Sequence, residues 1–292
     1  MTSLRQLEYL VTVVDTGSFT RAAEQLHVTQ PALSHQMRAL EHSVGGPLLE
    51  RLPRSVRLTP MGRAMLPHAR AALADAERAR CAARQASGQV AGELLVATVY
   101  SVSLGVLPPA LRVWRRERPD VDVRLFEYRH ADELRDAMLA GEADLAIGPR
   151  PAGWTGPVRT LGTEEFVVVL PADGATESTS DGTVDLAELA DCAWVHYAPG
   201  HGLAELLDAA CAEAGFRPRP AVRTEQTAAA PLLAAAGLGP ALVPANVLPA
   251  EFSGRVLRPG KPIRRELVAY GRSEPDPLTA AFGEMLTQHA RV

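Results

Sequence analysis

The sequence is poor in cysteine, aromatic residues and lysine, and it has no long apolar run. Its three cysteines, Cys81, Cys192 and Cys211, are far apart and form no CxxC pair, which excludes a disulfide framework and a cysteine-ligated zinc site. A membrane-spanning helix needs roughly 18 uncharged apolar residues, and the opening stretch, MTSLRQLEYL, lacks the segments of a signal peptide. We therefore expect a cytoplasmic protein with no membrane partner.

Motifs of common enzyme and metal sites are also missing. The sequence contains no HExxH, GxSxG or P-loop motif, and its short glycine-containing stretches lack the third glycine of a dinucleotide-binding loop. None of the eight histidines are spaced four apart, as two metal ligands on one helix face would be. We expect a protein that is not an enzyme, with no catalytic residue, no metal and no cofactor.

Charge is unevenly distributed along the 292 residues, whose net charge is −4. Residues 1–90 contain 11 arginines against 7 acidic residues, a net charge of +4, so residues 91–292 contain 19 basic against 27 acidic residues, a net charge of −8. The amino-terminal third is therefore the part suited to a polyanion. The length favours two domains over one.

A helix-turn-helix is predicted in the first 45 residues. Amphipathic spacing predicts a first helix at Leu4, Leu7, Val11 and Val14, and residues 18–28 predict a second, short helix with a small-residue face and a tight turn. The turn leads to the segment TQPALSHQMRALEHSVG, which begins at a good N-cap, Thr29.

This segment predicts a helix with one apolar stripe, because Leu33, Met37, Leu40 and Val44 recur at spacings of four, three and four. The second helix of a helix-turn-helix enters the major groove of DNA with its amino-terminal residues against base edges. Polar residues that can form hydrogen bonds lie off the stripe near that end: Gln30, Ser34, His35 and Arg38. Arginine pairs bidentately with guanine and glutamine with adenine. By itself, such a face is more often that of a merely solvated helix, and the segment that follows is needed to favour DNA recognition.

Residues 45–62, GGPLLERLPRSVRLTPMG, predict a two-stranded wing with Arg51, Arg54 and Arg57 at its tip, where they suit phosphates or a minor groove. An alanine-rich stretch from Thr59 to residue 85 then predicts one long helix, bent at Pro67. Leucine and alanine at heptad positions form a seam to which a partner helix could pack. The alternative is a monomeric linker helix.

These segments closely resemble the LysR-type transcriptional regulators. The resemblance lies in LRQLEYLVTVVDTGSFTRAAEQLHVTQPALSHQMRALE, LLER and VRLTPMG, with leucine at Leu49 where the family usually has phenylalanine. From the pattern and the resemblance we predict these DNA-binding residues: Thr29, Gln30, Pro31, Ser34, His35, Arg38, Arg51 and Arg54.

Beyond a small-residue join, SGQVAGE, strand and helix patterns alternate. Repeated β-α-β units imply a mainly parallel sheet covered by helices. One helix is expected from Leu104 to Arg116, further helices around DLAELA and APLLAAAG, and a return of the last strand, RELVAYG, to the first lobe.

The resemblance implies an α/β effector domain similar to periplasmic binding proteins of type 2, with two lobes around a cleft. We expect a winged helix-turn-helix in residues 1–58, a linker and dimerisation helix in 59–88, and the effector domain in 89–292. Lobe I would comprise about 91–161 and 266–292, and lobe II about 162–265.

Ligands of open α/β sheets bind at the carboxyl ends of strands, and the residues that follow the predicted strands are the candidates for binding an effector. They are Tyr100, Ser101, Val102, Tyr128, Arg129, His130, Pro199, His201, Thr224, Gln226 and Thr227. Arg129 would favour an anionic effector and the tyrosines an aromatic ring, although a strand-end arginine can equally be a solvated surface residue. Cys192 and Cys211 are the only candidates for a redox role in this domain, and their apolar neighbours favour inert, buried thiols.

The sequence thus predicts a bacterial LysR-type regulator whose DNA binding or activation is controlled by a small molecule. The resemblance implies a dimer, assembled as a dimer of dimers or homotetramer, on an inverted repeat of promoter DNA. It also implies association with the nucleoid, and RNA polymerase is a candidate further partner. The rival is a small-molecule-binding protein whose amino-terminal domain serves only for assembly.

Overall fold

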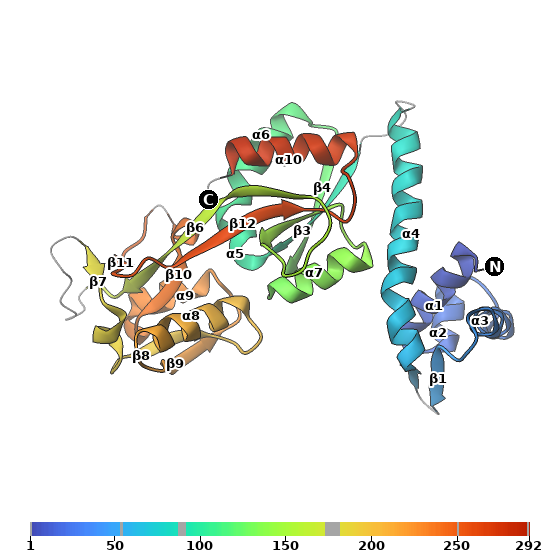
Figure 1. The fold of residues 1–292 in the computed structure, drawn as a ribbon, viewed down its shortest axis with the longest axis horizontal. Helices are drawn as coiled ribbons and strands as arrows, with labels where there is room; N and C mark the ends of the chain where they lie inside the picture. The colour runs from blue at the N-terminus through green and yellow to red at the C-terminus, as the bar shows by residue number, and fades with distance from the viewer. Residues whose placement is uncertain (1, 53–54, 87–91, 173–181, 250, 291) are drawn as a thin grey trace. The chain divides into compact units, whose positions relative to one another are not determined.

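The computed structural model describes residues 2–52, 55–86, 92–172, 182–249, 251–290 and 292 (Figure 1). The chain divides into two compact units: one comprises residues 1–92 and 136–143, and the other comprises residues 93–135 and 144–292. Among the described residues, no helix is both long enough and apolar enough to cross a membrane.

Three short helices form the core of the amino-terminal unit: α1 (Leu4–Thr16), α2 (Phe19–Gln25) and α3 (Gln30–Val44). Each begins at a capping residue whose side chain accepts a backbone N–H of the first turn: Ser3 for α1, Ser18 for α2 and Thr29 for α3. Gly17 and Gly45 end α1 and α3 in the left-handed conformation, at φ of 63° and 86°, which glycine adopts without strain. The predicted helix-turn-helix is confirmed.

The stripe predicted for α3 is its core face, since Leu33, Met37 and Leu40 are fully buried. The buried face of α1 differs from the prediction. Leu4 is 50% exposed, whereas Leu10 and Val13 are fully buried. Leu4 is the first residue of the helix and lies one turn before the packed segment.

A β-hairpin follows α3, formed by β1 (Leu49–Leu52) and β2 (Ser55–Leu58), which pair antiparallel with Leu49 opposite Leu58. The Glu41 carboxylate on α3 accepts the backbone N–H of Leu48 at 2.9 Å and of Leu49 at 3.2 Å. This carboxylate anchors the hairpin to α3, so the predicted wing is present.

The long helix α4 (Pro60–Ala86) is continuous through Pro67. Its cap is the one predicted, because the Thr59 hydroxyl accepts the Gly62 N–H at 3.0 Å and donates to the Pro47 carbonyl at 2.7 Å. Pro60 occupies the first helical position, where the absent N–H costs nothing.

The first lobe of the second unit has parallel strands at its centre. Its strands are β3 (Glu93–Val99), β4 (Asp122–Tyr128), β5 (Leu145–Pro149) and β12 (Arg264–Tyr270). Its helices are α5 (Tyr100–Gly105), α6 (Leu107–Glu117) and α10 (Pro277–His289), and α7 (Ala131–Ala140) begins in this lobe. β3 lies parallel to both β4 and β5, and β12 is antiparallel to β5. The last strand and helix return to the first lobe, as expected.

The second lobe contains the middle of the chain. Its strands are β7 (Thr183–Val184), β8 (Ala193–Tyr197), β9 (Arg219–Thr224), β10 (Ala241–Pro244) and β11 (Arg255–Pro259). Its helical segments are η1 (Leu186–Leu189), α8 (Gly202–Glu213), α9 (Ala229–Leu233), η2 (Ala234–Leu238) and η3 (Ala245–Val247). Trp194, Tyr197 and Leu207 are fully buried in its core.

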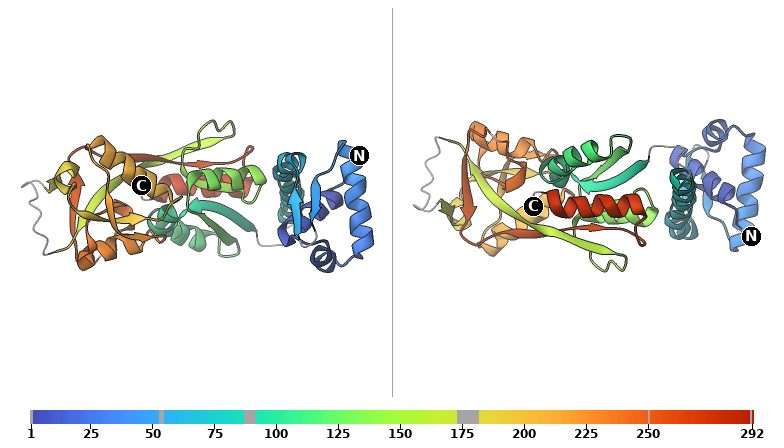
Figure 2. Two further views of the ribbon diagram at one scale, coloured as in Figure 1. Left: turned by 90° about the horizontal axis from the view of Figure 1, so that it is seen from below. Right: turned by 90° about the horizontal axis from the view of Figure 1, so that it is seen from above.

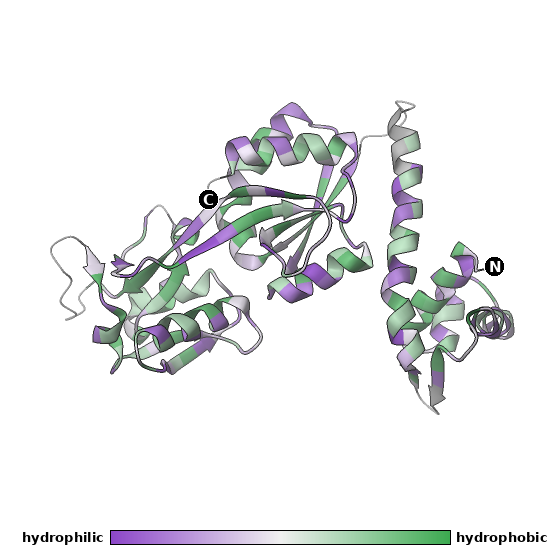
Figure 3. Ribbon diagram, in the orientation of Figure 1, coloured by the Kyte–Doolittle hydropathy of each residue, from purple (hydrophilic) through white to green (hydrophobic). Residues whose placement is uncertain are grey.

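The two lobes share the long strand β6 (Val158–Leu170), visible in Figure 2 as the yellow-green strand that runs between them. Its first part pairs with β12 as far as Glu165 opposite Arg264, and its last part pairs with β10 and β11. Hydrophilic colouring marks the start of β12, where the chain crosses back (Figure 3). The lobes therefore separate near Glu165 and Arg264.

Three local predictions were wrong. The sheet is mixed and not mainly parallel, because every pairing of β6 is antiparallel. The single helix expected from Leu104 is two helices, α5 and α6, since Pro108 and Pro109 are tolerated only in a first turn. The segment DLAELA forms one 3₁₀ turn, η1.

Candidate functional site

The amino-terminal turns of α3 present a polar surface. Gln30, Pro31, His35 and Arg38 are exposed, as is the capping residue Thr29. Arg38 donates from Nε to the Ser34 carbonyl at 3.3 Å, which leaves its two terminal nitrogens as donors for another acceptor. This surface has the donors and acceptors that base edges require.

Ser34 departs from the expectation, because it is only 4% exposed. Its hydroxyl accepts the Gln30 side-chain amide at 3.1 Å. The face that α3 buries against α1 and α2 is wider than the apolar stripe, and Ser34 lies at its edge. Ser34 thus positions the exposed side chain of Gln30 through this hydrogen bond.

The arginines of the wing are described only in part. Arg57 is exposed on β2 and lies opposite Glu50 in the hairpin register. Arg51 is paired opposite Val56 through its backbone, and Arg54 lies outside the described residues. The hairpin is present, and the DNA contacts of Arg51 and Arg54 stay predictions.

Two adjoining cavities occupy the predicted cleft region between the lobes. The first, of about 220 Å³, is lined by five of the predicted effector-binding residues: Tyr100, Ser101, Arg129, His130 and His201. The second, of about 410 Å³, is lined by three of them: Tyr100, Gln226 and Thr227. Tyr100 belongs to both, so the carboxyl end of β3 lies at the centre of the cleft.

The other four predicted residues lie outside the linings of these cavities. Val102 is fully buried and Tyr128 is half-buried. Pro199 is exposed, and the Thr224 hydroxyl accepts the Gln226 N–H at 3.1 Å, which shapes the loop after β9. A position just after a strand was therefore too coarse a criterion, because alternate residues there turn to opposite sides.

His201 is a buried, neutral histidine at the start of α8. Burial, with a smaller effect from Arg265 and Arg129, lowers the pKa of its imidazole to about 4. Its Nδ1 accepts the Leu203 N–H at 3.2 Å, so Nε2 carries the proton and donates to the Thr227 hydroxyl at 3.3 Å. The ring stacks on Tyr197 at 4.8 Å between centroids. His201 therefore forms a fixed wall of the cleft.

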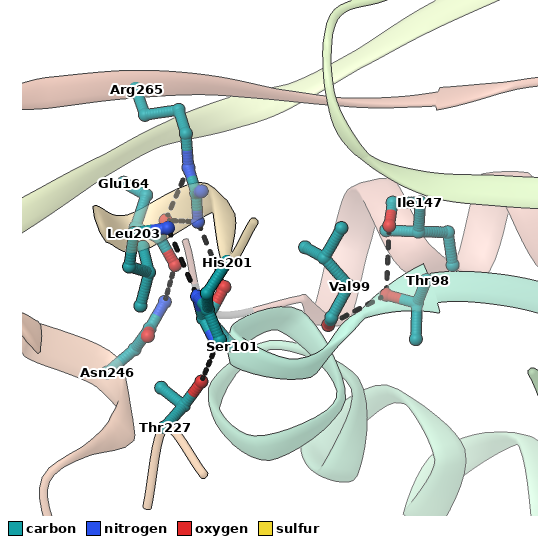
Figure 4. Close-up of polar contacts among 10 residues, drawn as sticks. All are labelled: Thr98, Val99, Ser101, Ile147, Glu164, His201, Leu203, Thr227, Asn246 and Arg265. Carbon is teal, nitrogen blue, oxygen red and sulfur yellow. Dashed lines mark hydrogen bonds and ion pairs between the residues drawn. The ribbon is translucent and has the colours of Figure 1, made fainter. Parts of the chain in front are cut away.

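A buried ion pair lies beside this wall, where β6 and β12 cross between the lobes (Figure 4). Arg265 donates from Nε to Glu164 at 3.0 Å and from Nη2 to the Ser101 hydroxyl at 2.9 Å. The other carboxylate oxygen of Glu164 accepts the Asn246 amide at 3.2 Å. Ser101 belongs to the first lobe and Asn246 to the second, so this network joins both lobes to the crossing strands.

Direct contacts also close the cleft at its mouth. The Gly202 N–H donates to the Arg129 carbonyl at 2.9 Å, and His130 Nε2 lies 3.2 Å from a Glu205 carboxylate oxygen. The His130 Nδ1 accepts the Asp132 N–H, so Nε2 is the nitrogen that donates to Glu205. The two lobes are thus in contact through α8.

The charges of the cleft are mixed. The first cavity contains Arg129 and Arg265 as well as Glu205, whereas the second contains Glu127 and Glu225. Arg129 is 45% exposed and lies 3.4 Å from Glu133. An anionic group would be favoured only in the first cavity.

Sequence reasoning missed Glu164, Arg265, Asn246 and Glu205. Glu164 and Arg265 are 101 positions apart, and only the register of β6 with β12 brings them together. Arg265 at the start of the predicted strand RELVAYG was the one available signal, since a charge that enters a strand core is usually paired.

Cys192 and Cys211 are both free cysteines. Cys211 is fully buried, and burial raises the pKa of its thiol to about 12. A thiol in this environment is a poor nucleophile.

Comparisons with known proteins agree with this geometry. The family model of the bacterial regulatory helix-turn-helix protein, lysR family, matches residues 4–63, and that of the LysR substrate binding domain matches residues 87–291. The HTH-type transcriptional regulator IlvR of Caulobacter vibrioides is 34% identical over 252 residues, which cover 84% of this chain and 83% of IlvR.

Solved structures of full-length regulators share the fold. A full-length OxyR variant from Pseudomonas aeruginosa has a TM-score of 0.74 at 27% identity and covers 99% of this chain and 94% of its own. Full-length CbnR in complex with its target DNA has a TM-score of 0.69 at 27% identity, and the match covers 98% of this chain and 99% of the CbnR chain.

Proposed function

Because the chain belongs to the LysR family of bacterial transcriptional regulators, which bind promoter DNA and self-associate, we propose how its own residues perform this function. The protein is an effector-responsive regulator and not an enzyme. The observation that carries the proposal is the exposed polar surface of α3, which lies beside an apolar stripe whose Leu33, Met37 and Leu40 are fully buried.

Gln30, Pro31, His35 and Arg38 would contact DNA from the major groove, with Thr29 at the cap of α3. Ser34 would act by holding Gln30, and Arg51 and Arg54 would reach the DNA backbone or minor groove from the wing. Two copies of this winged helix-turn-helix, paired through α4 (residues 59–88 in the proposed domain division), would bind an inverted repeat. Its half-sites would lie about one helical turn or a multiple apart. A dimer of dimers that recruits RNA polymerase is the proposed active assembly.

A protein that regulates chromosomal promoters works where the chromosome lies. We therefore propose a cytoplasmic location, at the nucleoid while the protein is bound to DNA.

The effector would occupy the two cavities around Tyr100. Ser101, Arg129, His130 and His201 would contact it in the first cavity, and Gln226 and Thr227 in the second. A small molecule with an anionic group directed at Arg129 and a ring beside Tyr100 fits these linings.

Two measurements test the proposal. Selection of duplexes from a randomised pool by the full-length protein should yield an inverted repeat, and binding to it should weaken steeply with salt. A thermal-shift screen of metabolites should identify a stabilising compound, since a ligand at 100 times its Kd adds about 2.7 kcal/mol to stability. Selection of no common sequence would contradict the DNA-reading role of α3.

A further inference from the structure

A hollow of about 400 Å³ lies on the amino-terminal unit between the start of α1 and the start of α3. Its lining comes from both helices: Ser3, Arg5, Tyr9, Ala32, His35 and Gln36. His35 also belongs to the exposed surface of α3. The hollow therefore adjoins the surface proposed to enter the major groove.

Arg5 is held in this hollow by a buried tyrosine. Tyr9 is only 6% exposed, and its hydroxyl accepts the Arg5 Nε–H at 2.8 Å. The Arg5 guanidinium carbon lies 5.7 Å from the centre of the Tyr9 ring. Because Nε is bound to Tyr9, the two terminal nitrogens of Arg5 are left to bind a ligand, and none of the described residues that line the hollow is acidic.

The hydrogen bonds around Arg5 leave two further groups able to donate. Gln6 Oε1 accepts the Ser3 N–H at 3.1 Å, so the Gln6 amide nitrogen is the donor to Gln36 Oε1 at 3.3 Å. The amide nitrogen of Gln36 therefore keeps its hydrogens for another acceptor. The hydroxyl oxygen of Ser3 accepts the Gln6 N–H at 3.3 Å, so the hydroxyl hydrogen can donate to another acceptor.

We propose that this hollow binds a phosphate of the DNA backbone flanking the groove that α3 enters, with Arg5 and Gln36 as donors and Tyr9 as the residue that positions Arg5. An arginine fork suits a phosphate, and contacts of this kind fix the register of a protein on a duplex without reading its sequence. The inference rests on DNA binding by this unit. It adds α1 to an interface otherwise predicted only on α3 and the wing.

The test compares variants of the full-length protein by fluorescence anisotropy. The probes are the duplex selected from a randomised pool by the wild type and a scrambled duplex of equal length, over a salt series. Arg5→Ala should weaken binding to both duplexes by about tenfold and reduce the slope of log K against log salt by about 1. Arg5→Lys should keep the slope. Tyr9→Phe should weaken both by a smaller factor with the slope unchanged, because the charge remains.

Arg116→Ala is the charge-matched control, since Arg116 is an exposed arginine on α6 of the other unit, and it should bind like the wild type. Wild-type affinity and slope in Arg5→Ala would overturn the proposal. A loss of affinity with an unchanged slope would also overturn it, because Arg5 would then act only within the fold. Failure of the wild type to bind any duplex would instead contradict DNA binding as a whole.

Discussion

At the scale of single residues, Arg38 is the side chain of α3 best placed to discriminate between bases. It is exposed, and its Nε is bound to the Ser34 carbonyl, which orients the guanidinium. We expect Arg38→Ala to weaken binding to the selected duplex by about 1–3 kcal/mol and to relax base preference at one position. Ser43→Ala, exposed on the same helix with its hydroxyl bonded to the Leu40 carbonyl, is the control. Equal loss on selected and scrambled duplexes would reduce Arg38 to a phosphate contact.

His201 gives the effector domain a predictable dependence on pH. Its pKa is about 4 in the folded chain, below the ordinary value of 6.5, so the unfolded chain binds more protons between these two values. Stability therefore falls as pH decreases from 6.5 towards 4. Between pH 7 and pH 5 this histidine should contribute a loss of about 2 kcal/mol.

The measurement is urea unfolding at pH 7 and pH 5. His201→Asn keeps an N-cap for α8 but cannot titrate in this range. The decrease in its free energy of unfolding from pH 7 to pH 5 should therefore be smaller than that of the wild type by about the same 2 kcal/mol. An identical pH dependence in both proteins would show that the imidazole is not desolvated as described.

At the scale of elements, the local patterns predicted the helices and strands that bury a periodic apolar face. The stripe of α3 and the strands around Ala146 and Val168 are of this kind, because burial on one or both faces fixes the spacing. β11 has the sequence RVLRP, whose single apolar pair is neither an alternation nor a buried run, and β7 has two residues, so neither carries a local signal. The pairing of β6 with β12 depends on contacts between residues far apart in the sequence. The Glu164–Arg265 ion pair of the cleft forms only because of this pairing.

The crossing strands β6 and β12 offer two adjacent ion pairs that differ in burial. Glu164 with Arg265 is nearly buried, at 1% and 15% side-chain exposure, whereas Glu165 with Arg264 is 57% exposed at both residues. Glu164→Gln leaves the Arg265 charge uncompensated, and we expect it to destabilise the chain by about 3–5 kcal/mol. Glu165→Gln should cost no more than about 1 kcal/mol. Urea unfolding at pH 7 measures both, and similar costs would mean that water reaches the inner pair.

At the scale of the whole molecule, charge and fold divide the chain in the same way. Residues 1–90 carry the net charge of +4 and the helix-turn-helix, and residues 91–292 carry −8 and the cleft. An acidic effector domain has no electrostatic attraction for DNA, so the phosphate-dependent affinity belongs to the first unit. The response of one unit to a ligand in the other must then be a coupling free energy between two sites.

Such coupling is reciprocal, so the factor by which the effector changes the Kd for the selected duplex must equal the factor by which the duplex changes the Kd for the effector. For Arg129→Ala we expect the effector Kd to rise by about tenfold or more if the effector is anionic, while the duplex Kd without effector stays at the wild-type value. Glu133→Gln, which removes the carboxylate 3.4 Å from Arg129, should bind the effector at least as well as the wild type. Titration calorimetry with the compound found by thermal shift measures these values. An unchanged effector Kd in Arg129→Ala would remove this arginine from the effector site. A changed duplex Kd in the absence of effector would instead place the role of Arg129 in the fold or the assembly. An effector acts only through its differential affinity for the two arrangements of the chain, so a residue that contacts the effector alone cannot change that value.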